Sequence, residues 1–346
     1  MAAAPAAIST GATRIDWADY GKGMCIVFVV LMHSTFGVEH AMGREGFVHA
    51  AIDFMTPFRI PDFFLLSGLF VSRVIERDWR DVLDRKVVHF LYFLLLWAGI
   101  AFLVKDVATG QATLVQLPVA MLQSIVDPPG TLWFIQMLPV FFIVAKATRR
   151  LPVALVLGAA AALEIAHIDT GIFVVDQFCA RLVFFLVGWR LSQQIFERAA
   201  WAQAHVGTAL AALAAWALVN GGAVALGVSA WPVISLILAL MGAFAVVTAA
   251  ALMAKWDTLF APLRYCGRNT LIIYLAFFLF MAASRAALIR FSPIQDPGLI
   301  SLLVASVAVV GPLLLHLLVR NTPAKFLFVR PEALKRARGA RLQPAE

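Results

Sequence analysis

The segment YGKGMCIVFVVLMHSTF, residues 20–36, is an almost unbroken apolar run with a lysine near its start and a histidine near its end. Lys22 and His33 stand 11 residues apart, which on an α-helix corresponds to about 16 Å of rise and about 20° of rotation. We therefore expect both side chains on one stripe of a helix, with Lys22 at one membrane surface and His33 more than half-way across. An ionisable imidazole costs free energy in hydrocarbon, so it indicates either a functional site or a polar partner on a neighbouring helix.

The composition of the whole chain indicates the same environment. Its 346 residues are 62% hydrophobic and only 14% charged, with a mean hydropathy of +0.87, whereas a soluble domain carries about 25% charged residues. The 27 phenylalanines and 9 tryptophans fit lipid-facing surfaces and interfacial belts. We therefore predict an all-α, polytopic membrane protein. In a soluble chain the net charge of +8 would suggest a nucleic-acid partner. In a membrane protein the distribution of the basic residues along the chain decides its meaning, and we expect no nucleic-acid partner.

Ten apolar segments have about the 20 residues that are needed to cross ~30 Å of hydrocarbon. These segments are 20–38, 50–72, 87–107, 131–148, 151–168, 172–194, 204–226, 231–254, 266–288 and 298–319. The run at 114–126 is too short and contains Pro118, so we expect it to be interfacial or re-entrant. The sequence thus predicts a bundle of about ten transmembrane helices.

The basic residues predict the orientation of this bundle. If the amino terminus is cytoplasmic, most of the 28 lysines and arginines fall on the cytoplasmic side. The exceptions are Arg44, Lys105, Arg285 and Arg290 on or near the outside, and Arg59 and Arg181 within spans. We therefore expect both termini inside. The chain divides into a flexible amino terminus at 1–19, a membrane domain at 20–320 and a basic cytoplasmic tail at 321–346, whose charge fits attraction to anionic lipid.

Two charged residues interrupt the second predicted span. Arg59 and Asp62 flank Pro61, and proline removes a backbone donor, which membrane helices tolerate where protein or a cavity meets the freed carbonyl groups. The two side chains could pair with each other. Alternatively, the guanidinium group of Arg59 could bind an anionic acyl donor or a phosphate. The residues alone leave both interpretations open.

The fifth and sixth spans hold further buried charges. Arg181 lies about a turn and a half below Asp176 and must face a partner or a wet cavity, with Glu164 and Asp176 as possible partners. Glu164 and His167 share a helical face and resemble half of a di-metal carboxylate site. The chain has no second copy of this motif, and its cysteines Cys25, Cys179 and Cys266 lack metal-ligand spacing. We therefore expect no metal site.

Other polar positions have ordinary structural explanations. Trp133 in the fourth span fits an interfacial anchor, and Asn269 fits an N-cap of the ninth helix. The segment 77–86 alternates acids and bases, so a solvated helix face or loop is favoured over a site that recognises a donor substrate. Residues 204–254 are rich in small apolar residues and almost empty of polar groups, so we expect a scaffold of closely packed helices.

Four short motifs occur in a recognisable order between residue 19 and about residue 275. They are Asp19-Tyr20-x-Lys22-Gly23 through His33-Ser34, Pro61-x-Phe63-Phe64-x-x-Ser67-Gly68, Leu132-Trp133-Phe134, and Gly267-Arg268-Asn269-Thr270 through Tyr274-Leu275. Together they resemble the acyltransferase-3 family of bacterial integral-membrane O-acyltransferases, which have about ten helices and modify surface and secreted glycans. The spacing of a basic residue, ten residues and a histidine is that family's hallmark, here Lys22 to His33.

The resemblance implies transfer of an acyl group, usually acetyl, from cytoplasmic acyl-CoA to a hydroxyl of a surface or periplasmic glycan. It places the chain in the bacterial cytoplasmic (inner) membrane, with acyl-CoA as donor substrate, a glycan or lipid-linked sugar as acceptor, and no bound cofactor. By resemblance His33 is the catalytic histidine, as a general base on the acceptor hydroxyl or as a transient acyl carrier. Lys22 would suit the donor phosphates or carbonyl, and Trp133 would line the acceptor or acyl path.

Four further residues are candidates for binding the substrate or the acyl donor. Arg59, Arg73 and Arg181 are chosen on their chemistry more than on a motif, and Asp62 on its place beside Arg59. The chain also departs from the family pattern. Many members have histidine where this chain has Arg59-Ile60 before Pro61, an apolar residue in place of Asp62, and a histidine just after Tyr-Leu, where this chain reads Tyr274-Leu275-Ala276-Phe277. If either of those histidines takes part in catalysis in other members, the mechanism of this chain differs from theirs.

The alternative from another class is a transporter or flippase of a glycan or lipid-linked sugar. Its path would be lined by the stripe from Lys22 to His33 and by Arg181, and a broken second helix suits such a protein equally well. We find no convincing inverted repeat between the halves of the sequence. A membrane scaffold or sensor would leave His33, Arg59 and Arg181 without a role. Dependence on acyl-CoA distinguishes the enzyme from both alternatives.

Overall fold

The computed structural model describes residues 16–334, which form helices and their connections and contain no β-strand. The predicted all-α class is therefore confirmed. The first eight helices are α1 (Asp16–Met42), α2 (Val48–Met55), α3 (Pro61–Gly68), α4 (Ser72–Ile75), α5 (Trp79–Val82), α6 (His89–Phe102), α7 (Leu117–Gln123) and α8 (Trp133–Ala147). The remaining eight are α9 (Val153–Ile165), α10 (Phe173–Arg190), α11 (Ser192–Ala204), α12 (Val206–Ala225), α13 (Ile234–Met253), α14 (Asp257–Arg268), α15 (Thr270–Phe291) and α16 (Pro297–Val319). The π-helical segment Leu83–Val88 joins α5 to α6, and a second one, Leu103–Val107, extends α6, so that Trp79–Val107 forms one rod.

Seven helices of the described chain are long and apolar enough to cross a membrane. They are Asp16–Met42, Trp79–Val107, Gly130–Ala147, Val206–Ala225, Ile234–Arg268, Thr270–Phe291 and Pro297–Val319. This confirms a multi-pass membrane protein, whereas the count of ten and the orientation of the termini stay predictions. The other three predicted spans differ for physical reasons: 50–72 is broken between α2 and α3, α9 has only 13 residues, and α10 carries three charged residues.

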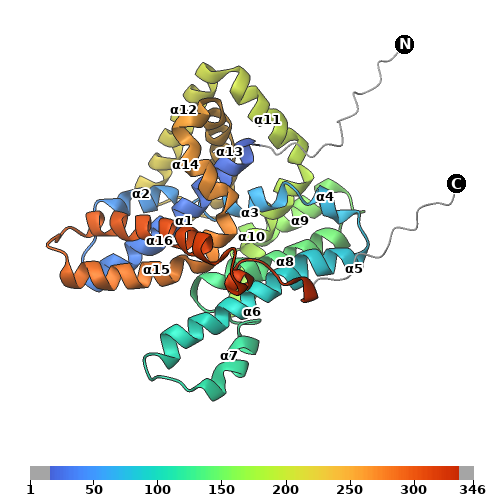
Figure 1. Ribbon diagram of the computed structural model, residues 1–346. Helices are drawn as coiled ribbons and strands as arrows, with labels where there is room; N and C mark the ends of the chain where they lie inside the picture. Colours follow the sequence, from blue (N-terminus) through green and yellow to red (C-terminus); the bar gives the residue numbers. More distant parts are fainter. Residues whose placement is uncertain (1–15, 335–346) are drawn as a thin grey trace, which may run out of the picture.

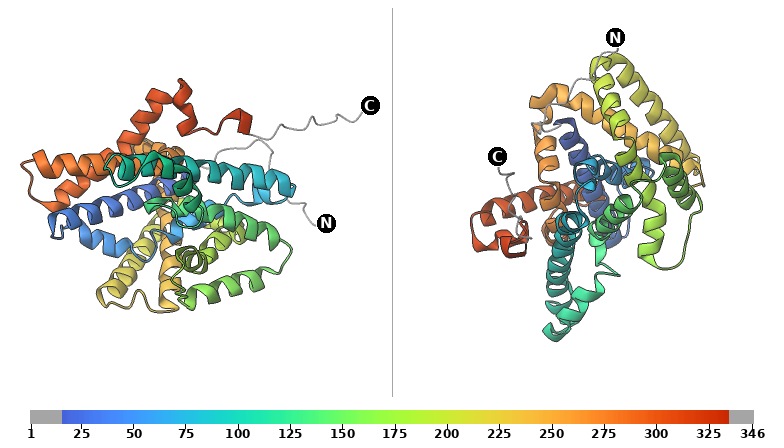
Figure 2. Two further views of the ribbon diagram at one scale, coloured as in Figure 1. Left: turned by 90° about the horizontal axis from the view of Figure 1, so that it is seen from below. Right: turned by 90° about the vertical axis from the view of Figure 1, so that its right-hand side faces the viewer.

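The helix that contains residues 20–36 is central to the packing. Helix α1 contacts α2, α3, α13, α14, α15 and α16. In Figure 1, α1, α2, α15 and α16 extend to the left, α11–α14 lie at the top, and α3–α5 with α8–α10 lie on the right. The lower arm holds α6 and α7, and Figure 2 shows the same groups from two further sides. The polar residues on α1 therefore face several helices at once.

The crossing of α1 and α14 requires glycine. A Cβ at Gly23 would lie 2.1 Å from the carbonyl oxygen of Leu263, and a Cβ at Gly267 would lie 1.6 Å from that of Asp19. Beside this contact, the Arg268 Nε atom donates to Asp19 Oδ2 at 3.4 Å. Two motifs that are nearly 250 residues apart in the sequence thus meet at one helix crossing, because small residues let the backbones approach closely.

Some expectations about connections need correction. Asn269 occupies the N-cap position of α15 but makes no side-chain cap; its Nδ2 atom donates instead to the carbonyl oxygen of Tyr265 at 2.9 Å and closes the end of α14. Residues 79–86 are helical and Arg77, Asp78, Arg80 and Arg85 are exposed, as a solvated face requires, but Asp84 pairs with Arg330 at 2.8 Å. Arg330 is buried, so the beginning of the predicted tail packs against the helices. Residues 1–15 and 335–346, which hold most of the predicted flexible amino terminus and the end of the tail, lie outside the described residues.

Candidate active site

His33 lies on α1, half-buried against α15. The centroid of its ring is 5.8 Å from that of Phe277, and the two ring planes are inclined by 37°. Phe277 follows closely after Tyr274-Leu275 on α15, so an aromatic face stands beside the imidazole. Arg59 lies near enough for its charge to act on His33. The site therefore combines an imidazole, an aromatic wall and a cation within the helix bundle.

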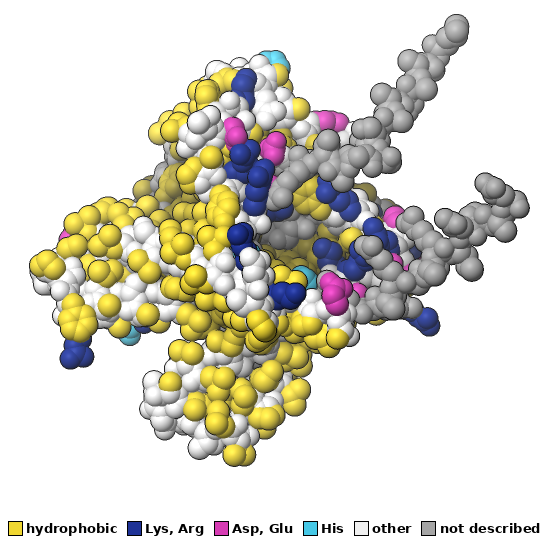
Figure 3. Space-filling model, viewed as in Figure 1, with side chains coloured by type: hydrophobic (Ala, Val, Ile, Leu, Met, Phe, Trp, Pro, Cys, Tyr) yellow, Lys and Arg dark blue, Asp and Glu magenta, His cyan; other side chains and the backbone are white. Residues whose placement is uncertain are grey.

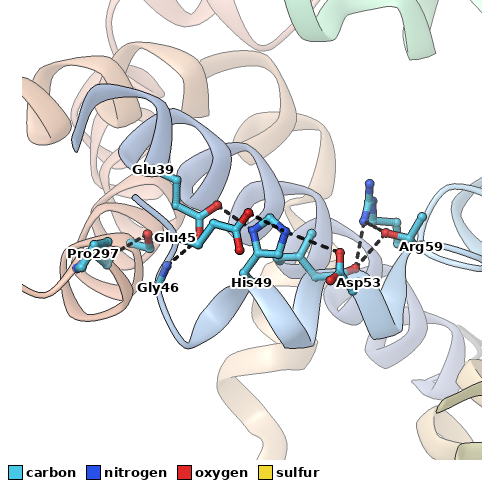
Figure 4. A network of polar contacts seen from close by, with 10 residues as sticks. Glu39, Glu45, Gly46, His49, Asp53, Arg59 and Pro297 are labelled. Atoms are coloured by element: carbon cyan, nitrogen blue, oxygen red, sulfur yellow. Dashed lines mark hydrogen bonds and ion pairs between the residues drawn. The ribbon is translucent and has the colours of Figure 1, made fainter. Parts of the chain in front are cut away.

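The break between α2 and α3 positions Arg59. Its Nη1 atom donates to the carbonyl oxygen of Ile52 at 3.1 Å and to Thr56 Oγ1 at 2.8 Å, as Figure 4 shows at the end of α2. The Thr56 hydroxyl also donates to Ile52 at 2.9 Å. Helix α2 ends at Met55, and the amide of Thr56 bonds to the carbonyl oxygen of Asp53, so the carbonyl oxygen of Ile52 is available to the guanidinium group. The local geometry thus follows from the gap between the end of α2 at Met55 and the start of α3 at Pro61.

Asp62 does not pair with Arg59. Its side chain is fully buried, and neither carboxylate oxygen makes a conventional hydrogen bond to the part of the chain that the structure describes. The Cys25 thiol, a weak donor, lies beside it. The alternative in which the two charges neutralise each other by direct contact is therefore wrong, and the guanidinium of Arg59 turns to α2 instead.

Arg181 on α10 lies close enough to Arg59 and Glu164 to interact with their charges. Its Nε atom donates a long hydrogen bond to Gln177 Oε1 at 3.4 Å. No ion pair joins it to Glu164 or Asp176 within residues 16–334, and Asp176 instead accepts hydrogen bonds from the amide and hydroxyl of Thr170 at 2.8 Å each. The expected carboxylate partners are therefore only near neighbours of this cation.

A group of cations lies around the amino-terminal part of α1. Lys22 Nζ lies 5.0 Å from the ring centroid of Phe70, and the guanidinium carbon of Arg73 lies 4.6 Å from the same centroid. The charge of Lys86 also interacts with that of Lys22. In Figure 3, lysines and arginines gather over the side of the molecule that carries α3–α5 in Figure 1. We call Lys22, Arg73 and Lys86 the cationic cluster; such a group can hold phosphates.

Trp133 belongs to an aromatic wall at the start of α8. Its ring centroid lies 5.9 Å from that of Phe64 and 5.8 Å from that of Phe173. One position before this motif begins, the carbonyl oxygen of Thr131 accepts a hydrogen bond from the Tyr274 hydroxyl. The second, third and fourth sequence motifs therefore meet here, whereas the ring beside His33 is that of Phe277 and not that of Trp133.

Sequence reasoning missed several participants. Phe70 and Phe277 look like ordinary apolar residues, and only their places against Lys22 and His33 reveal a role. Ser235 lies in the segment interpreted as scaffold, yet its hydroxyl donates to Glu164 Oε1 at 3.0 Å. An isolated serine in an apolar run is a weak signal, because it more often bonds to its own helix.

Comparison with known proteins agrees with these motifs. Residues 15–317 match the family model described as an acyltransferase domain. Inner membrane protein YcfT of Escherichia coli (strain K12) is 24% identical over 162 residues, which cover 40% of this chain and 45% of YcfT. The match thus spans less than half of that relative. No solved structure shows a significant match. Since the family model covers most of the length of this multi-pass membrane protein, the chain belongs to the acyltransferase-3 family.

Proposed function

We propose that this membrane acyltransferase moves an acyl group, acetyl in the simplest case, from cytoplasmic acyl-CoA to a hydroxyl of a surface or periplasmic glycan. The observation that carries the proposal is the arrangement along α1. The cationic cluster surrounds Lys22 at one end, and His33 follows about 16 Å along the same helix. A donor with phosphates at one end of an extended arm and a thioester at the other matches this spacing.

The cationic cluster fits the phosphate end of the donor. Lys22 and Arg73 both lie over the ring of Phe70, at 5.0 and 4.6 Å from its centroid, and Phe70 thereby limits the movement of both. Two cations held in this way can form charge-assisted hydrogen bonds to a diphosphate. Because the cluster lies on the predicted cytoplasmic side, it would select a donor that the cytoplasm supplies.

His33 fits the chemical step. In the direct route, a ring nitrogen takes the proton of the acceptor hydroxyl while the hydroxyl oxygen forms a bond to the thioester carbon. The carbon–sulfur bond then breaks, and the thiolate of CoA takes the proton back from the imidazolium. In the two-step route, the ring nitrogen first accepts the acyl group and CoA leaves as its thiolate. The acceptor oxygen then displaces the imidazole, and the proton of the acceptor hydroxyl passes to the released thiolate. Both routes need a ring nitrogen that faces both substrates.

The remaining candidate residues have supporting roles in this proposal. Arg59, which interacts with His33, would stabilise the negative charge that develops on the carbonyl oxygen. Trp133 would line the acyl path through its aromatic wall, and Asp62 would shape the interior beside Cys25. The similarity to an inner membrane protein of Escherichia coli supports a place in the bacterial cytoplasmic membrane.

Mass spectrometry of cell-surface and periplasmic glycans tests the proposal. Cells that contain the wild-type chain should carry glycans that are heavier by one acyl group per modified sugar, and cells that lack the chain should not. The His33→Ala variant should behave like the deletion, whereas His40→Ala, a matched change at an exposed position of the same helix, should behave like the wild type. If whole unmodified glycans accumulate inside the deletion strain instead, the protein is a transporter and the proposal is wrong.

A further inference from the structure

A cavity of about 400 Å³ opens between α9, α10, α13 and the turn after α2. It lies at the ends of these helices that the basic-residue pattern predicts to be outside. Its polar lining residues are Thr56, Glu164, His167, Asp176, Gln177, Arg181, Ser229 and Ser235. The volume falls within the range of small-molecule sites, about 300–1,000 Å³. None of the three residues that we assign to donor binding, Lys22, Arg73 and Lys86, lines this cavity.

Glu164 is the most buried of these polar side chains, with an exposed fraction of 8%. Its Oε1 atom accepts a hydrogen bond from the Ser235 hydroxyl at 3.0 Å, and His167 Nε2 lies 3.2 Å from the same hydroxyl oxygen. The second carboxylate oxygen, Oε2, has no partner among residues 16–334. A buried carboxylate with one oxygen oriented by a serine and the other unsatisfied calls for a hydrogen-bond donor from a ligand.

The opposite side of the cavity supplies donors. Arg181 lies near enough to interact with the charge of Glu164 but forms no ion pair with it. The guanidinium group has five N–H donors, and among residues 16–334 only the one on Nε makes a hydrogen bond, the long one to Gln177. The cavity therefore offers acceptors and donors on facing walls. Two carboxylates, Glu164 and Asp176, oppose the charge of Arg181 and disfavour an anionic ligand.

The backbone around this cavity is strained. Among residues 16–334, the non-glycine residues with a positive φ angle are His167 at 44° and Val233 at 68°. His167 lines the cavity, and Val233 precedes α13 by one residue and Ser235 by two. A β-branched residue in this region is unfavourable and persists only where the surroundings hold it. Both strained positions belong to or adjoin the same polar group, the hydrogen-bonded pair of His167 and Ser235.

Two side chains, Thr56 and Arg59, lead from the cavity toward His33. Thr56 lies on the cavity wall, and its hydroxyl oxygen accepts a hydrogen bond from Arg59 Nη1 at 2.8 Å. The charge of Arg59 interacts with both His33 and Arg181. A ligand in the cavity would therefore contact Thr56, and Arg59 would stand between this ligand and the imidazole of His33.

We propose that this cavity binds a neutral sugar unit of the acceptor. A sugar presents hydroxyl groups that both donate and accept, which matches the free oxygen of Glu164 on one wall and the guanidinium of Arg181 on the other. Binding here holds the acceptor chain beside Arg59 and brings a hydroxyl of that chain toward His33. The assignment rests on the proposed function, because it takes the acceptor to be a glycan.

Saturation-transfer NMR on the full chain in lipid nanodiscs tests the assignment without any acyl transfer. The probes are methyl glycosides of neutral hexoses and N-acetylhexosamines, with methyl glucuronide as the anionic counterpart. We expect saturation of at least one neutral glycoside by the wild type, and affinity for it reduced about tenfold or more by Glu164→Gln and by Ser235→Ala. Ser306→Ala on α16, an exposed serine that bonds to its own helix, is the matched control and should bind like the wild type.

The outcomes separate this inference from the proposed function. If only the glucuronide binds, or if Glu164→Gln and Ser235→Ala bind the neutral glycosides as the wild type does, the cavity is not the acceptor site. Variants are compared only when their thermal unfolding matches the wild type, and Ser235→Ala provides a second test should Glu164→Gln fail to fold. Acyl transfer that continues with an unchanged acceptor KM in Ser235→Ala would overturn the inference and leave the proposed function intact. Specific glycoside binding without any acyl-CoA turnover would support the cavity and contradict the enzyme.

Discussion

Gly68 and Gly188 each lie against the backbone of the other's helix where α3 crosses α10. A Cβ at Gly68 would be 2.1 Å from the carbonyl oxygen of Phe185, and a Cβ at Gly188 would be 2.0 Å from that of Leu65. Helix α3 follows the turn that carries Arg59, and α10 carries Arg181. This crossing therefore sets how near the two arginines approach each other, and with it the connection between the proposed acceptor cavity and His33.

Alanine at Gly68 or at Gly188 should destabilise the protein, because a methyl group in either place overlaps backbone that cannot move aside without parting the helices. Overpacking of this kind costs about 1–3 kcal/mol or more. Thermal unfolding in detergent checks the prediction. Gly158→Ala on α9 is the control, since a Cβ there meets nothing within 4 Å; it should leave the midpoint unchanged or raise it. A midpoint for Gly68→Ala equal to that of Gly158→Ala would contradict the described crossing.

A second prediction concerns pH. His49, which precedes the predicted span 50–72, has its Nδ1 atom 2.7 Å from Glu39 Oε2, with Glu45 and Asp53 at 3.9 and 3.7 Å from Nε2, as Figure 4 shows. The hydrogen bond to Glu39 raises the pKa of His49, and the neighbouring carboxylates raise it further. Because the pKa is higher in the folded state, the stabilisation is complete below the unfolded pKa of about 6.5. It is lost as the pH rises through the folded value.

The unfolding midpoint of His49→Gln should therefore lie furthest below that of the wild type near about pH 5.5 and converge with it at about pH 9. Thermal scans across this range provide the measurement. His40→Gln serves as the control, since His40 is exposed on α1. A His49→Gln deficit that is constant with pH, or that grows as the pH rises, would show that protonation of His49 does not link α1 to α2.

A third prediction concerns the cationic cluster. Replacing Lys22 or Arg73 with alanine should raise the KM for acyl-CoA about tenfold or more, because a charge-assisted hydrogen bond to a buried phosphate contributes about 1.5–3 kcal/mol. Lys22→Arg should retain most of the affinity. Arg290→Ala is a matched control, since the guanidinium of Arg290 lies over Phe291 at 5.5 Å, at the predicted outer end of α15. Equal KM values for Lys22→Ala and Arg290→Ala would remove the cluster from donor binding.

A fourth prediction concerns the buried carboxyl group. Asp62→Leu should raise the thermal midpoint, since a buried polar group without a hydrogen bond costs about 1–3 kcal/mol and leucine has an apolar side chain of similar size. Acyl transfer should persist at a reduced rate if Asp62 shapes the interior beside Cys25. A lowered midpoint would mean that the carboxyl group has a stabilising partner in the membrane-embedded protein, and complete loss of transfer would assign it a catalytic role.

The sequence predicts the general architecture well because its signals are local. Apolar segments, the proline before Asp62 and the spacing from Lys22 to His33 each depend on a few neighbouring residues. Those signals led to the all-α membrane class, to the break between α2 and α3, and to the family. The number of membrane crossings is harder to predict from the sequence. Helix α9 is short and α10 carries charged residues, so whether either crosses the membrane depends on the helices packed against it.

The arrangement of the candidate site could not be predicted in the same way. Whether Arg59 bonds to Asp62 or to Thr56 depends on how α2 and α3 are placed relative to each other. The periodicity of apolar residues in the sequence does not predict this placement. Ser235 gains its role only because α13 packs beside α9. The side chain of Asn269 likewise bonds backward to α14, although its type is typical of an N-cap.

The central claim is that His33 carries out acyl transfer, and its most direct test uses purified protein in nanodiscs with radiolabelled acetyl-CoA and an acceptor glycan. We measure label incorporated into the glycan by wild type, His33→Ala and His40→Ala, each shown to unfold at the wild-type temperature. We predict that His33→Ala loses about 10²–10⁴-fold in rate, the usual contribution of a general base, while His40→Ala retains the wild-type rate. Transfer by His33→Ala at the wild-type rate would contradict the account.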